Sequence, residues 1–191
     1  MRGILQSLTI LGALATVSTS ALAASREGVT LPDSQKVGEK ELVLNGIGIR
    51  EATIFNVNVY VAGLYVEEKT GDAAKIISPE ATKKILMHFV RDVDASDIQG
   101  AYNEGFEKNA DGKMAALKDR VAKLNSWMAD MKKGDKMSIT YVAGQGVTVN
   151  VKGKDKGTIE GADFAKVMFT IFFGPKPPNS DLKEGMLGQK K

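Results

Sequence analysis

Residues 46–66 read GIGIREATIFNVNVYVAGLYV, and this stretch carries the strongest fold signal in the sequence. In its second half, branched or aromatic apolar residues alternate with polar or small ones. A period of two with this composition is typical of a β-strand that is buried on one face. The apolar positions are Phe55, Val57, Val59 and Val61. Tyr60 falls between them, on the other face of the predicted strand.

The glycines of this stretch mark places where the backbone needs room. Gly46 and Gly48 stand at alternate positions of a predicted extended segment, where a second backbone can approach closely or a bulge can form. Gly63 is a predicted bulge in the following strand. A turn near Asn56 would fold the whole stretch into a hairpin. A continuous strand is the alternative, and the pattern alone leaves both open.

The rest of the chain predicts further strands and amphipathic helices. Helical spacing places Ile98, Tyr102, Phe106 and Asn109 on one stripe, and Ser96 with Gln99 reads as a capping box at its start. Segment 24–38 is predicted to be irregular, and the tail from Lys176 onward is polar and proline-rich, with lysines at its end. We expect strands at 84–90, 137–142 and 147–151, a turn at 154–157, and helices at 98–109, 114–128 and 164–172. This order predicts an α+β fold with a largely antiparallel sheet and helices on one face.

The first 23 residues have the features of a secretory signal peptide. A basic start is followed by a mostly apolar run over 4–17, and the small residues Ala21 and Ala23 fit a signal peptidase site. A membrane anchor is the alternative, but the apolar run is short for about 30 Å of hydrocarbon. We therefore expect cleavage after Ala23 and a periplasmic or secreted protein with a single domain over 24–191.

Composition excludes several kinds of site. The chain has no cysteine, so disulfides and thiol chemistry are absent, and its one histidine, His88, cannot build a histidine-rich metal centre. Its formal charge of +3 is scattered along the sequence, without the basic stripe of a nucleic-acid-binding protein. We expect no metal, no cofactor and no nucleic-acid partner. The oligomeric state is not specified.

Four polar residues with apolar neighbours are candidates for a binding site. They are Arg50, Tyr60, Tyr102 and Asn109. Each alone has an ordinary structural explanation: a surface arginine, tyrosines with packed rings, or an amide bonded to a nearby backbone group. Their chemistry becomes informative only when they are considered together with the surrounding motifs.

Those motifs, taken in order, resemble the chalcone isomerase family over residues 31–187. They are Gly46 to Arg50, Val59 to Tyr65, Phe89 to Asp92, the pair Tyr102 and Asn109, and Phe164 to Pro175. The resemblance is to a bacterial, exported member. It implies an open-faced β-sandwich, in which a large antiparallel sheet is covered by a helical layer with an apolar cleft between them.

The family resemblance implies two possible activities. One branch consists of isomerases, intramolecular lyases that close chalcones to flavanones, and here such a site would use Arg50, Tyr102 and Asn109. The other branch binds fatty acids, with an arginine and a tyrosine holding the carboxylate. Tyr60 stands where isomerases carry a threonine, and Ala165 where they carry a hydroxyl residue.

These departures favour non-catalytic binding of a fatty acid or similar apolar carboxylate. The expected ligand-binding residues are Arg50, Tyr60, Tyr102 and Asn109, and the expected lining of the tail cleft is Phe106, Phe164, Met168 and Phe172. The alternatives are the intramolecular lyase and, third, a structural envelope protein whose own side chains fill the cleft.

Overall fold

The structure is a computed structural model that describes residues 24–52 and 57–190. The predicted signal peptide over 1–23 lies outside these residues, as do Phe55 and Asn56 of the predicted strand and turn. In the two described ranges, no helix is long and apolar enough to cross a membrane.

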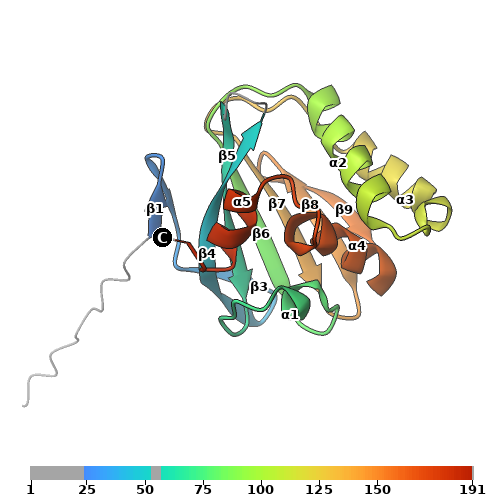
Figure 1. Ribbon diagram of the computed structural model, residues 1–191, viewed down its shortest axis with the longest axis horizontal. Helices are drawn as coiled ribbons and strands as arrows, with labels where there is room; N and C mark the ends of the chain where they lie inside the picture. The colour runs from blue at the N-terminus through green and yellow to red at the C-terminus, as the bar shows by residue number, and fades with distance from the viewer. Residues whose placement is uncertain (1–23, 53–56, 191) are drawn as a thin grey trace, which may run out of the picture.

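A seven-stranded antiparallel sheet forms the centre of the molecule (Figure 1). Its strands follow one another in sequence order, each paired with the next. They are β3 (Ser34–Val37), β4 (Lys40–Ala52), β5 (Val57–Val66), β6 (Lys83–Phe89), β7 (Lys136–Val142), β8 (Gly146–Val151) and β9 (Lys154–Ile159). Two short strands, β1 (Ala24–Arg26) and β2 (Val29–Leu31), form a separate hairpin.

The helices cover one face of this sheet, and the hairpin covers part of the other. The helices are α1 (Ala73–Ile77), α2 (Ala95–Asn109), α3 (Met114–Ser126), α4 (Ala162–Phe173) and α5 (Ser180–Met186). Their apolar side chains join the inward residues of β5 to β9 in the main core. The α+β prediction, with an antiparallel sheet under a helical layer, is therefore confirmed.

The sequence pattern did not decide between a hairpin and a continuous strand. The structure has the hairpin, formed by β4 and β5, since Ala52 pairs with Val57. The expectation that β5 buries one face only was wrong. From Val61 to Val66 every residue is buried, because the face that carries Val61 and Tyr65 packs against the β1–β2 hairpin. Segment 24–38, predicted to be irregular, supplies that cover. Its short strands contain too few residues to show a clear period.

Gly46 and Gly48 bring helix α5 directly onto β4. A Cβ atom at Gly48 would lie 2.2 Å from the Leu182 carbonyl oxygen, and one at Gly46 would lie 2.2 Å from that of Gly185. The predicted close approach of a second backbone is thus confirmed. The partner is a helix in the polar, proline-rich tail, for which no element was predicted, and its Leu182 and Met186 are fully buried.

Several local predictions are corrected by the backbone. Gly63 pairs regularly with Ile47 and Leu86. The register shifts between β4 and β5 fall elsewhere, with Asn45 as the extra residue of β4 and Val59 as the extra residue of β5. The N-cap of α2 is Asp94 rather than Ser96, because the backbone turns into the helix two residues earlier than the capping box suggested. Residues 154–157 belong to β9, and the preceding turn lies at 152–153, where both residues have positive φ.

Candidate ligand-binding site

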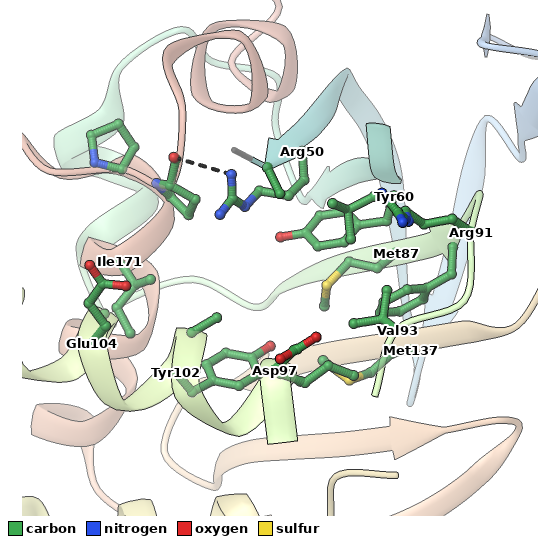
Figure 2. Close-up of a pocket in the computed structure, with 18 of the residues that line it drawn as sticks. Arg50, Tyr60, Met87, Arg91, Val93, Asp97, Tyr102, Glu104, Met137 and Ile171 are labelled. Carbon is green, nitrogen blue, oxygen red and sulfur yellow. Dashed lines mark hydrogen bonds between the residues drawn. The ribbon is translucent and has the colours of Figure 1, made fainter. Parts of the chain in front are cut away.

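A pocket of 590 Å³ lies between the inner face of the sheet and helix α2 (Figure 2). Strands β4, β5 and β6 form one wall, α2 forms the other, and residues 176–178 close part of the rim. Most of the wall is apolar. Its apolar side chains include Val59, Met87, Phe89, Val93, Ile98, Met137 and Ile171.

Strand register places Arg50 and Tyr60 side by side in this pocket. Arg50 of β4 is paired with Tyr60 of β5, which is paired in turn with Phe89 of β6. Residues directly opposite each other in an antiparallel pair have Cβ atoms about 5 Å apart and point to the same face. The Gly46 and Gly48 positions that seat α5 share that face with Arg50, because they alternate along β4.

The Arg50 side chain is held by the chain segment that precedes α5. Its Nη1 donates to the carbonyl oxygens of Glu51 and Pro178, the latter at 3.4 Å. Asn179 fastens the same segment to β4, since its Nδ2 donates to the Ile49 carbonyl at 2.9 Å. Within residues 24–52 and 57–190, Arg50 forms no salt bridge.

Two phenol groups lie in the same cavity as Arg50, as Figure 2 shows. Burial raises the pKa of Tyr60 to about 12, and the nearby charge of Arg50 lowers it only in part. Burial also raises the pKa of Tyr102, with a further contribution from its neighbour Tyr60. Both hydroxyls therefore stay protonated at neutral pH and can donate hydrogen bonds.

Asn109 does not line the pocket. It is buried on the α2 stripe as predicted, but its Nδ2 donates to the Gly105 carbonyl oxygen at 2.9 Å, one turn earlier in the helix. Of the four candidate residues, the fold thus brings Arg50, Tyr60 and Tyr102 together, whereas Asn109 is bonded to the backbone of Gly105 in its own helix.

The aromatic residues expected to line a tail cleft lie in the core instead. Phe106 stacks on Phe164 with ring centroids 5.1 Å apart, and both rings are fully buried, as is Met168. Ala165 is buried in the same layer. The strand β6 supplies the lining through Met87 and Phe89. The sequence contained this signal, because these residues share the inward parity of a predicted strand.

The site has the chemistry of an anion-binding apolar pocket. A guanidinium and two neutral phenols supply donors, and the wall supplies apolar surface. The residues that the structure describes contain no cluster of three His, Asp or Glu side chains able to hold a metal. His88 is not among the pocket residues, and its backbone position in β6 is paired with that of Lys136 in β7.

Comparisons with known proteins identify the family and agree with the fold. A family model described as chalcone isomerase-like matches residues 23–188. No curated protein matches the sequence. Among solved structures, the fold is similar to that of a fatty-acid binding protein from Arabidopsis thaliana, with a TM-score of 0.70 and 14% sequence identity. The match covers 86% of this chain and 95% of the plant chain.

Proposed function

The chain belongs to the chalcone isomerase-like family, and from this premise we propose that it is an exported, non-catalytic carrier of a fatty acid or similar apolar carboxylate. The observation that carries the proposal is the cross-strand pair of Arg50 and Tyr60 in the wall of an apolar pocket. The name of the plant structure, a fatty-acid binding protein, points in the same direction.

The head group of such a ligand matches the donors of the pocket. A planar guanidinium offers two parallel N–H groups to a carboxylate, and a neutral phenol adds another donor. The tail matches the walls, since burying a methylene group contributes about 0.8 kcal/mol. A cavity of 590 Å³ lies within the range of about 300–1,000 Å³ that is common for small-molecule sites.

The two alternatives fit the pocket less well. An intramolecular lyase would use Arg50, Tyr102 and Asn109, but Asn109 does not line the pocket and its amide is bonded to the Gly105 carbonyl oxygen. Ala165 also offers no hydroxyl and lies buried in the core. A structural protein with a self-filled cleft would leave little open volume, whereas this cavity measures 590 Å³.

Export is the second half of the proposal. It rests on the apolar segment at 4–17 and the cleavage motif that ends at Ala23. Strand β1 begins at Ala24, so cleavage after Ala23 would keep every described helix and strand.

Titration calorimetry with decanoate and decanol tests the head-group model. We expect the acid to bind wild-type protein more tightly than the alcohol. Arg50→Ala should weaken acid binding by about 2–5 kcal/mol, because a buried carboxylate would lose its charged partner. Arg50→Lys should restore only part of the loss, since an ammonium lacks the planar fork.

The exposed Lys118→Ala on α3 is the matched control, because it removes a positive charge away from the pocket. Equal affinities for acid and alcohol, together with unchanged acid binding in Arg50→Ala, would show that the arginine is structural and that the proposed function is wrong.

A further inference from the structure

Two adjacent cross-strand rows form the sheet wall of the pocket. The first row contains Arg50, Tyr60 and Phe89, one each from β4, β5 and β6. The second row lies two residues further along the strands, where Met87 of β6 is paired with Met137 of β7. A rise of about 3.4 Å per residue separates the rows by about 7 Å. Figure 2 shows Tyr60 between Arg50 and Met87, with Met137 beyond Met87.

The open space ends at the two methionines. Met87 and Met137 line the pocket, and only 1% and 2% of their surfaces are exposed. The next row along the strands contains Leu64, Ile85 and Ile139, which are fully buried and do not line the pocket. Along the strands, the cavity therefore closes at the methionine row.

A pair of methionines suits the end of an apolar chain. Residues directly opposite each other in an antiparallel pair point to the same face, with Cβ atoms about 5 Å apart. Met87 and Met137 therefore present their side chains to the same part of the cavity. An unbranched thioether adapts to the shape of an apolar neighbour and is only a weak hydrogen-bond acceptor. A terminal methyl group fits this surface, whereas a polar end group would lose its hydration without a strong partner.

Strand geometry gives the length of the chain that fits. Arg50 and Met137 are three strands apart and offset by two residues along the strands. With strands about 4.8 Å apart, their α-carbons are separated by about 16 Å. An extended hydrocarbon chain with bonds of about 1.5 Å advances about 1.3 Å per carbon, so about ten to twelve carbons cover this distance.

We propose that Met87 and Met137 form the end of the tail site and set the chain length of the ligand. The carboxylate binds at Arg50 and Tyr60, the chain passes over Phe89, and its terminal methyl group contacts the two thioethers. The ligand is then an unbranched acid of about ten to twelve carbons. This inference rests on the proposed function, since it adds a length limit to the same site.

A chain-length series in wild-type protein tests the proposal. Octanoate, decanoate, dodecanoate, tetradecanoate and hexadecanoate are titrated by calorimetry, each below its critical micelle concentration. Every methylene group that becomes buried should tighten binding by about fourfold. We expect this gain to stop at about ten to twelve carbons, because longer chains meet the methionine row.

Substitutions at the methionine row should move the limit. Met87→Ala and Met137→Ala each remove the side chain beyond Cβ, so the limit should shift to longer chains by about two carbons. Met87→Leu nearly conserves the volume and should leave the limit unchanged. Met168→Ala is the matched control, since Met168 of α4 is fully buried but does not line the pocket. It should lower the melting temperature without moving the limit.

The outcomes separate this inference from the proposed function. If affinity for wild-type protein keeps rising through hexadecanoate, the tail does not end at the methionines, although the carrier function stands. The same conclusion follows if both pocket alanine variants keep the wild-type limit, or if Met168→Ala moves it equally. Should those variants fail to fold, the wild-type series decides alone. If none of the acids binds, both proposals fail.

Discussion

Lys83 illustrates how the surroundings of one residue alter its chemistry. Its side chain is buried, with Nζ 5.0 Å from the ring centroid of Tyr141 and 4.8 Å from that of Phe169, and it donates to the Ser78 carbonyl oxygen. Burial lowers its pKa to about 8, although the charge of Glu80 raises it in part. The two rings stabilise the ammonium by cation–π contacts, but they do not replace its lost hydration.

We predict that stability rises with pH because of this residue. Lys83 loses its proton near pH 8 in the folded chain and near pH 10.5 in the unfolded chain. The unfolded state therefore binds more protons between these values, and the free energy of unfolding increases with pH. Urea denaturation at pH 7.5 and 9.5 should show a gain of roughly 1–2 kcal/mol. Lys83→Met should show a much smaller gain, and an equal gain in the variant would contradict the assignment.

Tyr60 provides a second residue-scale prediction. Tyr60→Phe removes one neutral donor and should weaken decanoate binding by about 0.5–1.5 kcal/mol. Because burial raises the Tyr60 pKa to about 12, the phenol stays protonated at pH 10, and the same loss is expected at pH 7.5 and pH 10. Calorimetry at both pH values measures it. A difference between wild type and variant that vanishes at pH 10 would show that the phenol ionises in its ordinary range.

At the scale of elements, helix α5 and strand β4 act as one unit. Gly46 and Gly48 let the helix backbone lie against the strand, and Asn179, the N-cap of α5, donates to the Ile49 carbonyl at 2.9 Å. The segment that leads into the helix then passes over Arg50 and forms part of the pocket rim. The two glycines thus allow α5 to pack on β4, and this packing places the rim segment next to Arg50.

Gly48→Ala should therefore disturb stability and binding together. Its new Cβ would lie 2.2 Å from the Leu182 carbonyl oxygen, so the backbones of β4 and α5 would have to move apart. We expect a loss of about 1–3 kcal/mol in stability by chemical denaturation, and weaker decanoate binding.

Gly100→Ala is the matched control, since nothing lies within 4 Å of a Cβ at that exposed position of α2. It should raise stability by about 0.4–1 kcal/mol, because alanine reduces the freedom of the unfolded chain. Similar effects of the two substitutions would argue against close packing of α5 on β4.

At the scale of the whole molecule, the sheet has two covers that are linked to each other. The β1–β2 hairpin packs on the outer face of β4 and β5, and α5 packs on the inner face of β4. Arg26 of β1 connects them, because its guanidinium donates to Asp181 of α5 at 2.9 Å and to the Ile47 carbonyl at 3.2 Å. The first and last segments of the described fold therefore hold the same strand from both sides.

The whole-molecule prediction concerns processing. Protein isolated from the cell envelope or the medium should have an intact mass that begins at Ala24, because the sequence Ala21-Leu22-Ala23 fits signal peptidase. Intact mass spectrometry measures this directly. A mass that still includes Met1 to Ala23 would contradict cleavage and favour a membrane anchor.

Much of the fold was predictable because it depends on local periodicity. Alternation identified strands β5 to β8, and the spacing of Ile98, Tyr102 and Phe106 identified the buried stripe of α2. Gly46 and Gly48 correctly indicated a close backbone contact. Of the candidate site, Arg50, Tyr60 and Tyr102 line one pocket. These patterns act over a few residues, so a single sequence contains them.

Tertiary structure decided the features that depend on distant partners. Segment 180–186 packs closely on β4 because Gly46 and Gly48, more than 130 positions earlier in the sequence, have no side chains in the way. Phe106 stacks on Phe164 in the core because α2 packs against α4, whereas the Asn109 amide is bonded within its own helix, to the Gly105 carbonyl. The pocket wall of Met87 and Phe89, and the place of Arg50 beside Tyr60, follow from strand register. Register is set by pairing between strands, which no local pattern in one strand contains.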